Sequence, residues 1–182
     1  MIEINGKSFE KYISSDKLAK KVKSLAKQIV DTYSVDNEND FRNLIVICVL
    51  NGAIPFFKDI VFELPKEITM DFIKISSYGN SMTTSGKIDL VMDTKFDVKG
   101  KNILIIEDIV DSGLTQKFIL EHYNKKEVKS IKVCSLFYKS VNNVTGIAPE
   151  LFGFEIQDHF IIGYGLDFDQ QGRNLKDVYV HN

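Results

Sequence analysis

The sequence predicts a single α/β domain, residues 1–182, built on a mainly parallel twisted sheet that is flanked by helices. Two observations predict this fold. Apolar runs such as residues 44–50 and 103–106 lack the alternation of a half-exposed strand, and unbroken apolar strands are typical of parallel sheets buried on both faces. Segments with helical spacing of apolar residues alternate with these runs. Because no repeat or linker interrupts the pattern, we expect one domain with a small hood formed largely by its C-terminal segment.

The first helix is predicted to begin at Asp16 and to end near Tyr33. Its apolar residues recur at helical spacing, lysines fill the opposite face, and Ser15 or Asp16 can serve as the N-cap. Two shorter helices are predicted at residues 53–62 and 114–123. The predicted strands are residues 44–50, 68–77, 87–92, 101–108, 130–139 and 159–167.

Composition and charge exclude two classes of partner. The net charge of -2 lacks the basic excess of a general nucleic-acid binder. The apolar runs are strand-length and too short to span a membrane, and residues 1–15 lack the pattern of a secretory signal. Cys48 and Cys134 lie inside apolar runs, which favours buried thiols over a disulfide or a metal site. We therefore expect a cytoplasmic protein that binds neither nucleic acid nor membrane.

Residues 103–115, ILIIEDIVDSGLT, carry the strongest chemical signal. An apolar strand is predicted to end in Glu107 and Asp108, and a Gly-containing turn from Asp111 to Thr115 then opens a helix. Backbone N–H groups at a helix N-terminus favour a phosphate, whereas two adjacent carboxylates suit sugar hydroxyls or a hydrated magnesium ion. Taken alone, DSGLT is equally typical of a solvated loop in which Ser112 caps the helix.

The whole segment resembles the phosphoribosyl-pyrophosphate signature of the type I phosphoribosyltransferases, and among them most those that act on hypoxanthine and guanine. The resemblance implies transfer of phosphoribose from phosphoribosyl pyrophosphate to a 6-oxopurine, with Mg²⁺ as cofactor. It implies that Glu107 and Asp108 meet the ribose hydroxyls and that Asp111 is the general base for the purine N7 proton. The turn that would hold the 5′-phosphate consists of Asp111, Ser112, Gly113, Leu114 and Thr115.

Two further segments match the family on the pyrophosphate side. Asn51 and Gly52 follow the strand at 44–50 and correspond to the pyrophosphate loop, although many members carry a basic residue where Asn51 stands. An ordinary Asn-Gly turn is the alternative. Ser77 and Tyr78 open a polar loop that corresponds to the mobile lid, which would exclude water during reaction. The alternative is a loop that only connects two strands, which would have the same composition.

The purine side of the resemblance lies at Lys139 and in the segment 158–175. The resemblance implies that Lys139 donates a hydrogen bond to the purine O6. The alternative is that Lys139 is a solvated residue that only ends the strand. His159 departs from the lysine that is frequent at its position. The other implied purine contacts are Phe160 by stacking, Ile161 by its backbone, Leu166 and Asp167. The implied metal ligands are Glu107, Asp108 and Asp167, and Arg173 would reach pyrophosphate unless it forms only a surface salt bridge.

Other functions remain open at this point. A xanthine-preferring enzyme has the same signature, and a regulatory protein that binds phosphoribosyl pyrophosphate would need a helix-turn-helix extension or a basic face. A dinucleotide-binding domain is excluded because no GxGxxG follows the first strand. By analogy with the family, we expect a homodimer or homotetramer.

Overall fold

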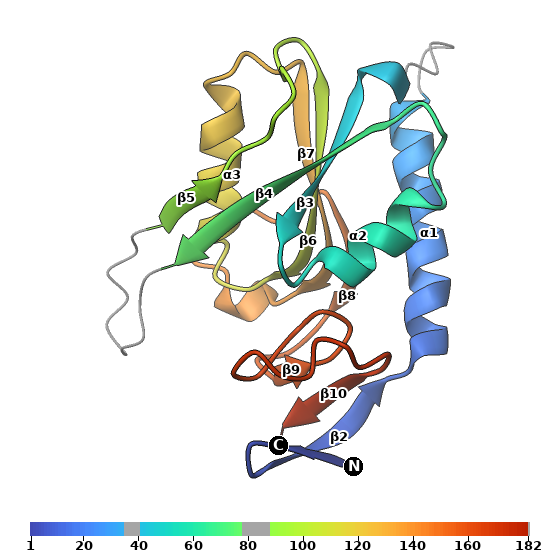
Figure 1. The fold of residues 1–182 in the computed structure, drawn as a ribbon, viewed down its shortest axis with the longest axis vertical. Coiled ribbons are helices and arrows are strands. Elements are labelled where there is room, and N and C mark those ends of the chain that lie inside the picture. The colour runs from blue at the N-terminus through green and yellow to red at the C-terminus, as the bar shows by residue number, and fades with distance from the viewer. Residues whose placement is uncertain (35–40, 78–87, 182) are drawn as a thin grey trace.

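The computed structural model describes residues 1–34, 41–77 and 88–181 (Figure 1). The helices are α1 (Ser15–Tyr33), α2 (Ile54–Val61) and α3 (Leu114–Asn124), with short 3-10 turns η1 (Phe41–Asn43) and η2 (Ser140–Asn142). The strands are β1 (Ile2–Ile4), β2 (Lys7–Ile13), β3 (Leu44–Leu50), β4 (Thr69–Ser77), β5 (Ile88–Met92), β6 (Asn102–Val110), β7 (Ser130–Tyr138), β8 (Leu151–Glu155), β9 (Phe160–Ile162) and β10 (Val178–His181).

The larger sheet confirms the predicted parallel α/β architecture. Its strand order is β5-β4-β3-β6-β7-β8, and every pair is parallel except the edge pair β4 and β5. Figure 1 shows α1 and α2 on one face of this sheet and α3 on the other. The arrowhead of β3 points toward the end of the molecule where β9 and β10 lie. Ligands of open parallel sheets bind beyond the carboxyl ends of the strands, so this end is where a site is expected.

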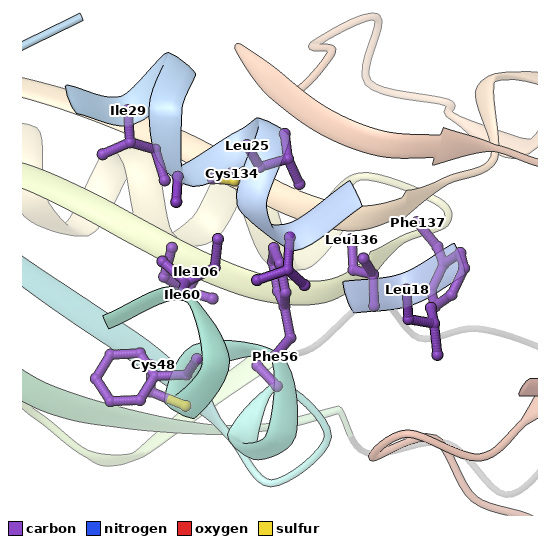
Figure 2. Close-up of a cluster of buried hydrophobic side chains, with 14 of the residues drawn as sticks. Leu18, Leu25, Ile29, Cys48, Phe56, Ile60, Ile106, Cys134, Leu136 and Phe137 are labelled. Atoms are coloured by element: carbon purple, nitrogen blue, oxygen red, sulfur yellow. The ribbon is translucent and has the colours of Figure 1, made fainter. Parts of the chain in front are cut away.

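The unbroken apolar strands are explained by two cores. In β3, Leu44, Val46 and Cys48 face the core under α1 and α2. The intervening residues Ile45 and Ile47 face the core under α3. Because successive side chains of a strand point to opposite faces, a strand covered on both sides must be apolar at every position. Figure 2 shows the first core, in which the thiols of Cys48 and Cys134 lie among aliphatic and aromatic side chains, and both cysteines are free.

Truncating Phe56 is expected to destabilise the protein by about 3–5 kcal/mol, because the side chain is 0% exposed at the centre of this core. Urea unfolding of Phe56→Ala would measure the loss. Phe96→Ala is the matched control, since Phe96 is exposed and its truncation should change stability by less than about 0.5 kcal/mol. Equal losses in the two variants would contradict the assignment of Phe56 to the core.

The second sheet differs from the predicted C-terminal hood. Its order is β1-β2-β10-β9, and all of its pairs are antiparallel. It contains the C-terminal strands β9 and β10, but β1 and β2 come from the N-terminus, where no strand was predicted. Residues 7–13 alternate too weakly to reveal a strand: only Phe9 and Ile13 are buried. The two ends of the chain therefore build the hood together (Figure 1).

Several predicted boundaries were wrong. The strand expected at 159–167 ends at Ile162, because Tyr164 and Gly165 donate their N–H groups to the carbonyls of Leu175 and Arg173 instead of to a sheet. The strand expected at 101–108 continues to Val110. The N-cap of α1 is Ser14, whose hydroxyl accepts from the Lys17 N–H. β8 was not predicted. Among the described helices, none is both long and apolar enough to cross a membrane.

Candidate active site

The sequence predicted that Glu107 and Asp108 end a strand, but both residues lie inside β6, which continues to Val110. β6 remains paired with β7 as far as Val110, but its pairing with β3 ends at Ile106. β3 continues beside β4 as far as Leu50 and then passes into the loop that starts α2. The two carboxylates therefore lie beside the residues that follow β3, at the carboxyl end of the sheet.

Gly52 packs directly against Asp108. A Cβ atom placed on Gly52 would collide with Asp108 Oδ2, so no larger residue fits there without movement. On its other side, the Gly52 carbonyl oxygen lies against Gly165 in the turn after β9. Asn51, the preceding residue, is exposed. The structure therefore brings the predicted pyrophosphate loop, the acidic pair and the C-terminal turn together.

Burial raises the pKa of both carboxyl groups in β6. For Glu107, burial and then the neighbouring charge of Asp108 raise the pKa well above its usual range. For Asp108, burial raises the pKa to about 6, although two backbone N–H groups and the charge of Arg173 act in the opposite direction. Glu107 Oε2 is buried and has no hydrogen-bond partner in the described part of the chain. An unpaired buried carboxylate is unfavourable, and this geometry suits a ligand that supplies hydroxyl groups or positive charge.

Adding a methyl group at Gly52 is expected to weaken binding of phosphoribosyl pyrophosphate, the ligand that the sequence resemblance implies, at least tenfold. It is also expected to cost about 1–3 kcal/mol of stability, since the Asp108 carboxylate must move. Calorimetry on Gly52→Ala would measure the affinity. Gly100→Ala is the control, because a Cβ atom at Gly100 meets nothing within 4 Å, although its positive φ brings backbone strain. That control should lose stability and keep its affinity. Unchanged affinity in Gly52→Ala would remove Gly52 from the site.

The turn from Asp111 to Thr115 leaves the N-terminus of α3 free of a side-chain cap. Gly113 is the N-cap residue at a φ of 78°, and the Ser112 hydroxyl accepts only a long bond of 3.4 Å from the Leu114 N–H. Ser112 is therefore not the helix N-cap. The uncapped N–H groups and the helix dipole together favour an anion.

The chain after β7 supports this turn from behind. The Val144 N–H donates to the Ser112 carbonyl at 3.1 Å. A Cβ atom on Gly113 would lie 2.6 Å from Thr145 Oγ1 and 2.7 Å from Asn143 Oδ1, so only glycine fits between the turn and its support. The combination of a positive φ and this close approach explains the glycine.

Lys139 and Asp111 form an ion pair. Lys139 follows β7 and is only 7% exposed, and its Nζ lies 3.1 Å from Asp111 Oδ2. The same Nζ lies 3.2 Å from Asp158 Oδ1, and the Asn142 amide donates to both carboxylates. The alternative of a solvated strand terminator is therefore wrong for Lys139. The sequence analysis placed neither Asp158 nor Asn142 in the site; for Asn142, the available signal was its spacing of three residues from Lys139.

Phe160 is held by two aromatic rings of the hood. Its ring centroid lies 6.3 Å from that of Phe9 and 5.6 Å from that of Phe168, yet Phe160 is 45% exposed. Ile161 and Leu166 are buried. Ile161 lies in β9, an edge strand that pairs only with β10, so part of its backbone faces away from the sheet. The sequence analysis did not identify Phe9, because it lies in the N-terminal strand β2, far from Phe160 in sequence.

Asp167 and Arg173 are paired, as the salt-bridge alternative expects. Arg173 Nη2 lies 2.7 Å from Asp167 Oδ1, and Nη1 donates to the Gly165 carbonyl at 2.9 Å. Nη2 also donates to Gln170 Oε1 at 3.2 Å. Because a guanidinium carries five N–H donors, these contacts leave donors for an anion. The pair also fixes the turn that lies against Gly52.

Two parts of the predicted site are not assembled by the described residues. Within residues 1–34, 41–77 and 88–181, no group of three His, Cys, Asp or Glu side chains is arranged to hold a metal ion by itself. Ser77 is the last residue of β4, and Tyr78 lies outside the described residues. The prediction of a lid that begins at Ser77 and Tyr78 is therefore untested.

Comparison with known proteins agrees with this geometry. The family model of the phosphoribosyl transferase domain matches residues 9–169. The hypoxanthine-guanine phosphoribosyltransferase of Aquifex aeolicus is 36% identical over 180 residues, which cover 99% of this chain and 98% of the relative. That of Bacillus subtilis is 39% identical over 168 residues, which cover 92% of this chain and 90% of the relative.

Solved structures of such enzymes share the whole fold. A crystal structure of a hypoxanthine-guanine phosphoribosyltransferase from Bacillus anthracis has a TM-score of 0.86 and 36% identity, and the match covers 95% of this chain and 98% of the other. A hypoxanthine phosphoribosyl transferase from Trypanosoma cruzi has a TM-score of 0.88 and 30% identity, with 100% and 95% covered. The expected family is confirmed: the chain belongs to the phosphoribosyltransferases and, among them, to the hypoxanthine-guanine phosphoribosyltransferases.

Proposed function

We propose that this enzyme transfers the phosphoribosyl group of 5-phosphoribosyl 1-pyrophosphate to hypoxanthine, guanine or both, giving IMP or GMP and pyrophosphate in purine salvage. The observation that carries the proposal is the 3.1 Å contact between Lys139 Nζ and Asp111 Oδ2. It joins a buried cation, which suits the O6 atom of an oxopurine, to a carboxylate that suits the N7 proton. Both lie beside the uncapped N-terminus of α3, where a phosphate would bind.

Phosphoribosyl pyrophosphate would contact three groups of residues. The 5′-phosphate would take the backbone N–H groups and hydroxyls of residues 111–115, and the ribose hydroxyls would take Glu107 and Asp108. The pyrophosphate would lie near Asn51, Gly52 and Arg173, and Ser77 and Tyr78 would cover it. Because Asn51 carries no charge, Arg173 and the backbone would provide most of the protein's own contacts to pyrophosphate.

The donor set fits Mg²⁺. Glu107 Oε2 is a buried oxygen without a described partner, and Asp108 and Asp167 supply further carboxylates. Mg²⁺ in phosphate-transferring enzymes is held by one or two carboxylates together with substrate phosphates and waters, so no complete protein cage is needed. When bound, the ion would neutralise charge on the pyrophosphate leaving group. Calorimetry of phosphoribosyl pyrophosphate with and without Mg²⁺ tests this, and equal affinities would remove the metal from the proposal.

The chain's own residues would act by positioning and by charge. Phe160 would stack on the purine, while the Ile161 backbone and Leu166 would border the ring. Asp111 would accept the N7 proton as N9 bonds to ribose C1, and Lys139 would stabilise the negative charge that develops on the base. Holding the base and the sugar in this geometry lowers the barrier without a covalent enzyme intermediate.

Neither alternative function is favoured. The relatives from Aquifex aeolicus and Bacillus subtilis and the solved structure from Bacillus anthracis are named hypoxanthine-guanine phosphoribosyltransferases. The deciding experiment measures nucleotide formation from hypoxanthine, guanine, xanthine and adenine with phosphoribosyl pyrophosphate and Mg²⁺. We expect IMP or GMP to form fastest. A preference for adenine would contradict the assignment of Lys139, because an ammonium cannot accept a hydrogen bond from the 6-amino group.

Three broader expectations belong to the same proposal. Residues 1–182 would unfold as one domain, in a single cooperative transition by circular dichroism. Two copies or four would associate through exposed apolar side chains at the end of α2 and on β4, namely Phe62, Met70 and Phe72. Light scattering would give the mass of the assembly.

The two free buried thiols agree with a reducing cytoplasm, which cell fractionation would test.

A further inference from the structure

The turn after β7 brings a second polar side chain to the contact between Lys139 and Asp111. η2 begins directly after Lys139, and the Asn142 N–H donates to the Lys139 carbonyl at 3.1 Å. In 3-10 geometry, side chains three residues apart lie above one another. The side chains of Lys139 and Asn142 therefore reach the same two carboxylates, Asp111 and Asp158.

Asn142 holds these two carboxylates together. Its Nδ2 donates to Asp111 Oδ1 at 2.8 Å and to Asp158 Oδ1 at 2.7 Å. The amide nitrogen carries two hydrogens, so both are used. Lys139 Nζ contacts the same carboxylates at 3.1 and 3.2 Å. The four side chains form a closed ring in which each carboxylate is bound by one ammonium and by one amide.

The ring restricts where Lys139 can donate. An ammonium group has three N–H donors. One is donated to Asp158 Oδ1 at 3.2 Å, and the charged nitrogen also lies 3.1 Å from Asp111 Oδ2 in an ion pair. These two contacts hold the nitrogen in place and so restrict the directions in which its remaining N–H groups can donate. The hydrogen bond from Asn142, followed by the contact with Lys139, also lowers the pKa of Asp158, so this carboxylate keeps the negative charge that holds the ammonium.

We propose that Asn142 is a positioning residue for purine recognition, which aims a free N–H of Lys139 at the O6 atom of the base by holding Asp111 and Asp158. The inference rests on the proposed function, in which Lys139 donates to O6. Asn142 does not touch the base. Without its amide, the charge of Lys139 remains, but the two carboxylates lose the neutral donor that bridges them, and the ammonium is no longer held in a fixed direction.

The test compares two nucleotides that differ only at position 6. IMP carries O6, whereas purine riboside 5′-monophosphate carries hydrogen at that carbon. Asn142→Leu removes the amide at similar size, and calorimetry gives both dissociation constants. We expect the variant to bind IMP about tenfold more weakly, the value of one hydrogen bond to a charged group, and to bind the other nucleotide less than about twofold more weakly. A merely structural role would weaken both nucleotides alike.

Two further variants keep the test interpretable. Val141→Ala lies in the same turn, 63% exposed and outside the ring, and should change neither dissociation constant. Asn142→Asp keeps the shape of the side chain and replaces the donors by acceptors, so it should repeat the selective loss if the leucine variant does not fold. Equal weakening of both nucleotides, or unchanged IMP affinity, would overturn the inference. Failure of the unaltered protein to bind IMP would instead refute the proposed function.

Discussion

Replacing Asp111 with asparagine is expected to lower kcat for IMP formation by about 10²–10⁴-fold, the usual contribution of a general base. The asparagine has the same shape and can still contact Lys139, but it cannot take the N7 proton. Asp111 is well placed for this role, because its side chain is 46% exposed toward the site while Lys139 and Asn142 hold both of its oxygens. Single-turnover measurements with hypoxanthine would isolate the chemical step.

The control for this prediction is Asp31→Asn, an isosteric change on an exposed part of α1. It should leave kcat unchanged. The affinity of Asp111→Asn for phosphoribosyl pyrophosphate should fall much less than kcat, since the phosphate turn is bound mainly through its backbone. An asparagine variant with full turnover would show that another group, or water, accepts the proton.

Replacing Lys139 with methionine is expected to lower kcat/KM for hypoxanthine by about 10²–10³-fold, a loss similar to that of one oxyanion-stabilising donor. The buried ammonium serves both the O6 atom and the charge that develops on the base. The effect on stability should be small, because the two carboxylates that lose the ammonium, Asp111 and Asp158, are 46% and 67% exposed and can be hydrated. Steady-state kinetics with hypoxanthine and thermal unfolding would measure the two quantities.

Lys132→Met serves as the matched control, since Lys132 lies earlier on the same strand β7 and is partly exposed. Its kcat/KM should stay within about twofold of the unaltered enzyme, which corresponds to less than 0.5 kcal/mol by the tenfold-per-1.4 kcal/mol rule. If Lys139→Met kept full activity, or lost it only in parallel with its folded fraction, Lys139 would not recognise the base.

Local pattern was enough to predict most elements of the larger sheet. β3 begins and ends at the predicted residues, since seven apolar residues in a row, bounded by polar ones, match only a buried strand. α1 was found because its apolar stripe repeats at helical spacing. β2 and β8 were missed because each buries few side chains and so carries a weak pattern. In β2 only Phe9 and Ile13 are buried, and in the edge strand β8 only Gly153 is buried.

Part of the candidate site could also be predicted from local sequence. The acidic pair and the phosphate turn lie within one continuous segment, so their neighbours in space are also neighbours in sequence. Asn142 and Phe9 were missed because their partners, Asp158 and Phe160, come from segments that only the fold brings close. In the sequence, Asn142 is only a polar residue in a turn and Phe9 only an aromatic residue in a strand. Many residues without a functional role have the same description.

The sequence alone determined the fold class, the family and the segment that holds the sugar phosphate, because these depend on periodicity and on one contiguous motif. Only the tertiary structure decided that Gly52 packs on Asp108, that Lys139 pairs with Asp111, and that the two termini form one hood. Such contacts join residues from different strand ends. The cause is the parallel sheet, which gathers the carboxyl ends of distant strands at one edge, and no local pattern encodes which side chains meet there.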